Sequence, residues 1–181
     1  MPEIDKILAD LRLGKVIAYP SEGVWGLGCD PNNKRAVLDL LKLKHRPQSK
    51  GLILVGSKLD QMSPYIDTEK YKKKLMTKWP GPHTWVVPTK KTPSWIKGQN
   101  KSVALRVSSH PVIVEICDKF DGAIVSTSAN QQGKPPLKTK EEVRNTFSEV
   151  SLVDGSLGDL CGATPIKDIV TNKWIRDKRD K

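Results

Sequence analysis

Short apolar segments alternate with amphipathic ones along the whole chain, and this alternation constrains the fold more than any other feature. The apolar residues of 3–13 recur at helical spacing, strand-like segments follow, and the same order repeats toward the C-terminus. No linker, internal repeat or low-complexity block interrupts it. The pattern predicts an α/β fold with a mixed sheet, and 181 residues suit one domain spanning 1–181.

Individual segments give sharper expectations. The expected helices are 3–13, a helix from about 33 to the Pro47 stop, two stretches within 58–79, one opened by Pro111, and one capped by Thr139 and Glu142. The expected strands are 15–19, 51–55, 83–87, 102–107, 123–127, 150–153, 165–170 and 174–176. In Ser102–Val107, strict alternation puts Arg106 on the face opposite the apolar residues, beside Ser102 and Ala104.

The net charge of +11 is concentrated in one part of the chain. Residues 42–106 contain 15 Lys and Arg against 3 acids, a net +12, which leaves −1 for the rest of the chain. The lysines of 70–78 are typical of a solvated helix face, although a surface for tRNA is the alternative. The cluster around Lys44 and Arg46 has no acids and precedes an apolar strand, so it indicates an anion site.

Several classes of protein are excluded or disfavoured by pattern. No run of 18 apolar residues exists, and the acidic N-terminus does not resemble a secretory signal, so we expect no membrane association. The three cysteines are far apart and form no CxxC, which favours the reducing cytoplasm. The three histidines form no HExxH, so no protein-built metal site is expected. No P-loop or GxSxG elbow is present either.

Polar clusters fall instead at the ends of expected strands, where α/β proteins place their sites. The clusters are Tyr19–Gly23, Lys44-x-Arg46 with Lys50, Ser102 with Arg106, and Ser126-x-Ser128-x-Asn130. Lysine offers phosphate a point charge, arginine a bidentate fork, and serine and asparagine neutral hydrogen bonds. Each cluster is weak evidence alone.

Taken together, the clusters resemble one family, the YrdC/TsaC threonylcarbamoyl-AMP synthases. The segments that carry the resemblance are AYPSEGVWGLGCDP (18–31), LKLKHRPQSKGLIL (41–54), WPGPHTWVVP (79–88), SVALRVSSHP (102–111), IVSTSANQQGKPP (124–136) and GATPIKDI (162–169). They follow the family's order over nearly the whole chain. The length is that of the short members, without the additional C-terminal domain of longer relatives.

The resemblance implies a fold and a reaction. The fold is a single-domain twisted mixed sheet with flanking helices and a basic central cavity. The reaction makes L-threonylcarbamoyladenylate and pyrophosphate from L-threonine, bicarbonate and ATP, with Mg²⁺ arriving on ATP. The product serves threonylcarbamoylation of the adenosine next to the tRNA anticodon. A functional link to the tRNA threonylcarbamoyl-transfer proteins is therefore implied, while binding of tRNA by this chain is left open.

The resemblance also implies residue roles. Lys44 and Arg46 are expected to be catalytic and to hold the phosphates of ATP. The further ATP-binding residues implied are Lys50, Ser102, Ser126, Ser128, Asn130 and Arg176. The L-threonine-binding residues implied are Ser21, Arg106 and Thr164. Glu22, the carboxylate nearest these motifs, is interpreted as a contact for Mg²⁺ or the substrate amine.

Two positions depart from the family, and two other functions compete. Gly23 stands where many members have a second threonine, and Val55 where longer relatives often have histidine. The first alternative is a non-catalytic module for tRNA or double-stranded RNA, although 6% aromatics give no visible stacking platform. The second is a carbamoyl-transfer relative like the hydrogenase maturation proteins, disfavoured because their accessory segments are missing.

Overall fold

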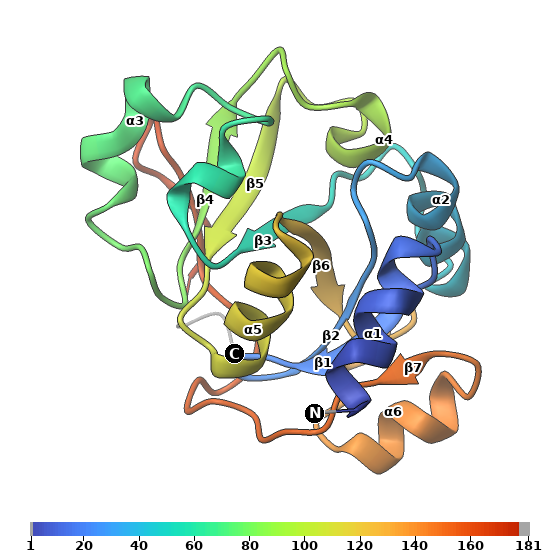
Figure 1. Ribbon diagram of the computed structural model, residues 1–181. Coiled ribbons are helices and arrows are strands. Elements are labelled where there is room, and N and C mark those ends of the chain that lie inside the picture. The colour runs from blue at the N-terminus through green and yellow to red at the C-terminus, as the bar shows by residue number, and fades with distance from the viewer. Residues whose placement is uncertain (1, 178–181) are drawn as a thin grey trace.

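The computed structural model describes residues 2–177 and shows one twisted mixed sheet flanked by helices (Figure 1), as the sequence predicts. The strands are β1 (Ile17–Pro20), β2 (Trp25–Gly28), β3 (Ile53–Gly56), β4 (Thr84–Pro88), β5 (Ser102–Val107), β6 (Ile124–Ser128), β7 (Ser151–Leu152), β8 (Ile166–Asp168) and β9 (Trp174–Arg176). The helices are α1 (Pro2–Arg12), α2 (Lys34–Leu43), η1 (Leu59–Met62, 3-10), α3 (Thr68–Leu75), α4 (Ser94–Lys97), α5 (Pro111–Phe120) and α6 (Lys140–Thr146).

The strand order is β7-β1-β2-β6-β3-β5-β4-β8-β9, so strands distant in sequence become neighbours. β3 pairs in parallel with β5, placing Val55 opposite Arg106, and antiparallel with β6, placing Val55 opposite Ile124. The pairs β1–β7 and β4–β8 are also parallel, and the remaining pairs are antiparallel. This crossing connectivity brings the polar ends of β5, β6 and β9 into one region.

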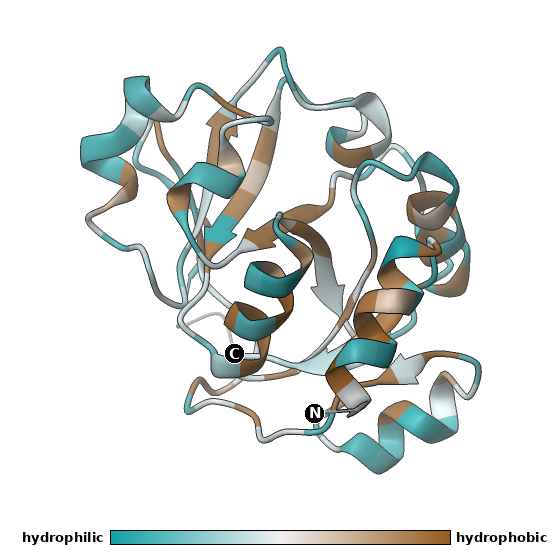
Figure 2. Cartoon of the chain, viewed as in Figure 1, coloured by the Kyte–Doolittle hydropathy of each residue, from teal (hydrophilic) through white to brown (hydrophobic). Residues whose placement is uncertain are grey.

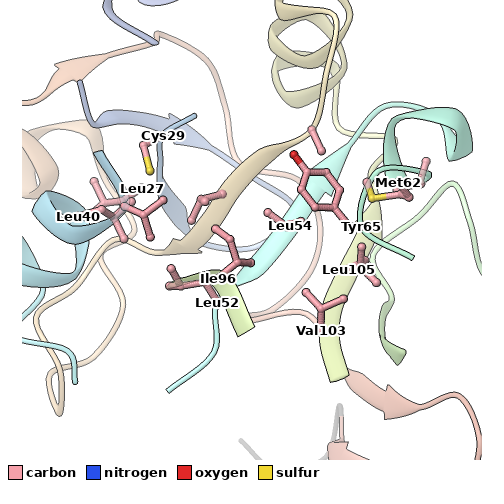
Figure 3. Close-up of a cluster of buried hydrophobic side chains, with 14 of the residues drawn as sticks. Leu27, Cys29, Leu40, Leu52, Leu54, Met62, Tyr65, Ile96, Val103 and Leu105 are labelled. Carbon is pink, nitrogen blue, oxygen red and sulfur yellow. The ribbon is translucent and has the colours of Figure 1, made fainter. Parts of the chain in front are cut away.

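One face of the sheet carries the larger hydrophobic core, which α2, α4 and η1 help to cover. Leu54, Val103 and Leu105 point into it together with Leu40 of α2 and Ile96 of α4 (Figure 3). The apolar residues of β5 therefore share one face, as the alternation predicts. Arg106 lies on the opposite face but is only 4% exposed, because β5 is an internal strand between β3 and β4.

The opposite face changes character along its strands. Beneath α1 and α5, which lie side by side (Figure 1), it is apolar and includes Val55 and Ile124. Two residues further along β6, the same face presents Ser126 and then Ser128. Every second side chain of a strand points to the same face. One end of β6 therefore packs under α5 with an apolar residue, while its other end presents hydroxyl groups on the same face.

Helix termini follow the local signals in the sequence. Asn33 caps α2 by accepting a hydrogen bond from the backbone N–H of Ala36, and Thr139 forms a capping box with Glu142. Pro111 occupies the first turn of α5, where no N–H is needed. The short helix α4 was not expected from the sequence.

The hydropathy of the surface differs among the helices. α1 and α5 show apolar stripes toward the sheet, whereas α3 is hydrophilic over most of its surface (Figure 2). No helix among residues 2–177 has the length and apolar character needed to cross a membrane.

Candidate active site

A cavity of about 220 Å³ opens on the polar part of the second sheet face. Its walls come from strands β2, β3, β5, β6, β8 and β9, the turn after β1, and the loop after α2. The remaining wall is the end of a segment that we call the strap (residues 158–164), of which 162–164 line the cavity. The polar side chains that line the cavity are Ser21, Arg46, Arg106, Ser126, Thr127, Ser128, Thr164 and Arg176.

Arg106 is the most deeply held cation of the cavity. Its Nη2 lies 3.2 Å from Oε2 of Glu22, and its Nη1 donates to the hydroxyl of Thr164 at 3.0 Å. Nε of Arg106 is buried without a hydrogen-bond partner. A buried guanidinium usually has all its donors satisfied, so an unused donor at a cavity wall is available to a ligand oxygen.

Thr164 joins Arg106 to a second arginine. Arg176 donates from Nε and Nη2 to the Thr164 carbonyl at 2.8 and 2.6 Å. The Thr164 hydroxyl accepts the hydrogen bond from Arg106 and shares a second one with the hydroxyl of Thr84 at 3.2 Å. Thr164 therefore fixes the spacing of two cations across the cavity.

Arg46 enters from the loop after α2. Its Nη2 donates to the carbonyl of Gly51 at 2.7 Å, while its Nε is buried with no partner. Burial lowers the pKa of the Arg46 guanidinium, because water that would solvate the charge is excluded. The group keeps its proton and offers unused donors to an anion.

Lys44 is turned away from the cavity and into a polar turn. Its Nζ donates to the carbonyls of Ser128 and Asn130, the latter at 2.6 Å, and to Oδ1 of Asn130 at 3.2 Å. The hydroxyl of Ser128 in turn donates to Oδ1 of Asn130 at 2.6 Å. Burial, assisted by the charge of Arg46, lowers the pKa of Lys44 to about 8. Lys44 and Asn130 thus shape the turn that presents Ser128 to the cavity.

The strap closes the cavity by packing directly on the turn between β1 and β2. Backbone N–H groups of Gly158 and Leu160 donate to the carbonyls of Ser21 and Glu22 at 3.0 and 2.8 Å. A Cβ atom at Gly23 would lie 2.1 Å from the carbonyl oxygen of Leu160. Only glycine therefore permits the observed contact at position 23.

The sequence of the chain was compared with models of known protein families. The Sua5/YciO/YrdC family model, described as telomere recombination, matches residues 9–171. The chain belongs to this family.

Family relatives cover nearly the full chain. A protein of Pseudoalteromonas atlantica named threonylcarbamoyl-AMP synthase is 46% identical over 96% of both chains. One of the same name from Photorhabdus laumondii is 43% identical over 97% of this chain and 96% of its own. The structure of P. abyssi Sua5 complexed with L-threonine superposes with a TM-score of 0.83 at 26% identity, over 91% of this chain and 50% of that one. These findings confirm the resemblance and the fold inferred from the sequence.

The structure of this family member brings together most of the residues singled out from the sequence. Those that line the cavity are Ser21, Arg46, Arg106, Ser126, Ser128, Thr164 and Arg176. Lys44 and Asn130 contact the cavity only through the turn at Ser128. Lys50 is exposed outside the lining, and Ser102 lies on the cavity face of β5 but at the far end of that strand. The binding roles assigned to all of these residues stay predictions.

One interpretation changes. Glu22 does not present a free carboxylate for Mg²⁺, because one oxygen accepts a hydrogen bond from Ser108 at 2.6 Å and the other faces Arg106. Thr84 and Ser108 were not predicted from the sequence, in which their only local signal is a hydroxyl residue at a strand end.

The charged groups of this family member's cavity do not form a metal-binding set. Within residues 2–177, no three His, Cys, Asp or Glu side chains are arranged to hold a metal ion. The carboxylate of Glu22 already has an arginine and a hydroxyl as partners.

Proposed function

We propose that the chain is a threonylcarbamoyl-AMP synthase, which makes L-threonylcarbamoyladenylate and pyrophosphate from L-threonine, bicarbonate and ATP. The observation that carries the proposal is the convergence of Arg46, Arg106 and Arg176 on one cavity, with hydroxyl groups between them. Relatives of this name at 46% and 43% identity support it. ATP is proposed to enter as its Mg²⁺ complex.

The residue roles divide the cavity into two ends. We propose that Arg46, Arg176, Ser126 and Ser128 contact ATP, with Lys44 and Asn130 holding the turn. Arg106, Ser21 and Thr164 are proposed to surround L-threonine, with the carboxylate of threonine on Arg106. Roles for Lys50 and Ser102 require a ligand larger than the present cavity, reaching toward its rim.

The chemistry follows from where charge develops. The amine of threonine adds to bicarbonate with loss of water, giving a carbamate. A carbamate oxygen then attacks the α-phosphorus of ATP, and the bond to the β-phosphate oxygen breaks. The leaving pyrophosphate gains negative charge that Arg46 and Arg176 stabilise more strongly than in the ground state. Holding three reactants together supplies much of the remaining rate enhancement.

The proposal extends to the setting of the reaction. Residues 1–181 are proposed to form one domain, and three free cysteines suit a reducing cytoplasm. The product is proposed to serve threonylcarbamoyl transfer to tRNA by other proteins. The threonylcarbamoyl group of the product is therefore proposed to end on tRNA.

The test is pyrophosphate release by the purified protein with ATP, L-threonine and bicarbonate, omitting each in turn. We expect release only when all three are present. Release that is independent of threonine would contradict the proposed substrate. A salt-sensitive affinity for RNA without any affinity for ATP would favour the non-catalytic alternative.

A further inference from the structure

Arg106 differs from the other cations in and beside the cavity because it forms an ion pair with a carboxylate, that of Glu22. Glu22 lies 3.2 Å from it, and the two side chains are 9% and 5% exposed. Within residues 2–177, Lys44, Arg46 and Arg176 make no salt bridge and donate only to uncharged oxygens. One end of the cavity therefore keeps full positive charge, while the other is neutralised before any ligand arrives.

The negative charge of Glu22 is fixed in place by its surroundings. Ser108 donates to its Oε1 at 2.6 Å, and the Ser108 hydroxyl accepts the backbone N–H of His110 at 3.0 Å. The Glu22 carbonyl accepts the N–H of Leu160 in the strap. Oε2 of Glu22 makes no hydrogen bond, although it lies against Arg106. The carboxylate thus faces the arginine without being free to swing away.

A buried acid at this place changes which ligands the arginine can accept. A ligand carboxylate on the free donors of Arg106 is attracted by the guanidinium and repelled by Glu22, and burial strengthens both interactions. A ligand that also carries an ammonium group offsets the repulsion. A ligand with only negative charge does not.

We propose that Glu22 is a specificity residue that adapts the Arg106 end of the cavity to a zwitterionic α-amino acid and disfavours simple anions there. Glu22 acts through Arg106 rather than by touching the reacting atoms. The inference rests on the proposed function, because it concerns the end of the cavity assigned to L-threonine. The Glu22 charge explains why the polyanion ATP does not bind at the Arg106 end, which is left to the amino acid.

The test compares L-threonine with (R)-3-hydroxybutyrate, which has the same carboxylate, hydroxyl and methyl groups but no amine. Binding of each to the full-length protein is measured by calorimetry. We expect the wild type to prefer threonine by about tenfold or more, the size of one partly buried charge interaction. In Glu22→Gln, threonine should weaken by about tenfold and 3-hydroxybutyrate should not weaken, while ATP affinity is unchanged.

Two control variants separate specificity from structure. Glu115→Gln removes a carboxylate of α5 that pairs with Lys119 at 3.1 Å, and it should change neither affinity. Ser108→Ala removes the hydrogen bond to Glu22 but keeps the charge, so the preference for threonine over 3-hydroxybutyrate should be retained.

The outcomes are distinct. If Glu22→Gln weakens both ligands equally, Glu22 is merely structural and the inference is wrong. If the wild type binds 3-hydroxybutyrate as tightly as threonine, the inference is wrong even when the variant does not fold. If the wild type binds no threonine, the proposed function fails and this inference fails with it.

Discussion

Lys44, beside the cavity, and the lysines of α3 belong to the same basic block of sequence, yet they are held in opposite environments. Lys44 is 3% exposed, and its ammonium group contacts three oxygens of one turn. Lys72 and Lys73 are exposed on a helix that is hydrophilic over most of its surface (Figure 2), and Lys72 only reaches Glu69 one turn away.

The difference teaches that the placement of charge, rather than its amount, marks the site. An exposed lysine is solvated by water and needs no ligand, whereas a buried cation must find oxygens within the protein or on a bound molecule. Arg46 and Arg106 each keep a buried Nε without a partner. We expect this contrast to have functional consequences.

The largest effect is expected for Arg46→Ala. Loss of a cation that stabilises the leaving pyrophosphate should reduce kcat/KM by about 100-fold or more, the cost of removing one preorganised donor. The melting temperature should stay close to that of the wild type, because among residues 2–177 the side chain makes only one hydrogen bond, to Gly51. Lys42→Ala, an exposed cation at the end of α2, is the matched control and should retain activity. A fall in melting temperature that parallels the loss of activity would show Arg46 to be structural.

A smaller effect is expected from pH. The pKa of Lys44 is lowered to about 8, so raising the pH from 7 to 9 removes its charge while the arginines stay protonated. Deprotonation removes a donor from the turn that presents Ser128 and a cation beside Arg46, so ATP affinity should fall by about tenfold as pH rises through this range, equivalent to about 1.4 kcal/mol. In Lys44→Arg, affinity should be nearly constant from pH 7 to 9, as measured by calorimetry. An equal fall in both proteins would assign the pH dependence to another group.

Thr164→Val should have a moderate effect. The substitution keeps the shape but removes the hydroxyl that accepts a hydrogen bond from Arg106. Loss of one such bond should raise KM for threonine by about three- to tenfold and leave KM for ATP nearly unchanged, because Arg176 contacts the carbonyl of Thr164 and not its hydroxyl. Equal changes in both KM values would mean that the strap has moved as a whole.

The smallest effect is expected on α3. The double variant Lys72→Ala, Lys73→Ala should change kcat/KM by less than about twofold, because exposed charges and their pairs contribute little. Lys74→Ala is the informative comparison, since Lys74 donates to the carbonyl of Ile169 at 2.5 Å and lies over the ring of Trp85. It should lower the melting temperature more than the double variant does. A strong loss of activity in the double variant would contradict the assignment of α3 to solvated surface.

Local sequence signals predicted most of the fold. The alternation in Ser102–Val107, the proline that opens α5 and the capping box at Thr139 all depend on residues close together in the chain. Their physical causes act over a few residues, so the pattern alone is sufficient. The helix α4 is four residues long, too short for a periodic signal to be distinguished.

The candidate site was predictable in its membership but less in its internal contacts. Family resemblance identified Arg46, Arg106 and Thr164, which line the cavity. It did not indicate that Lys44 turns toward a loop 84 residues away, or that Glu22 neutralises an arginine from another strand. Such contacts depend on strand order and register, which connect segments distant in sequence and leave no local pattern.

The direct contact between Gly23 and the strap has a consequence for how this chain can evolve. A Cβ at position 23 would also lie 2.3 Å from the carbonyl oxygen of Gly162, so no larger residue fits unless the strap is displaced. A larger residue at position 23 is therefore expected to be tolerated only together with a change that displaces the strap backbone. Grafting a relative's threonine onto position 23 alone should be deleterious, whereas transplanting it together with that relative's strap should be neutral.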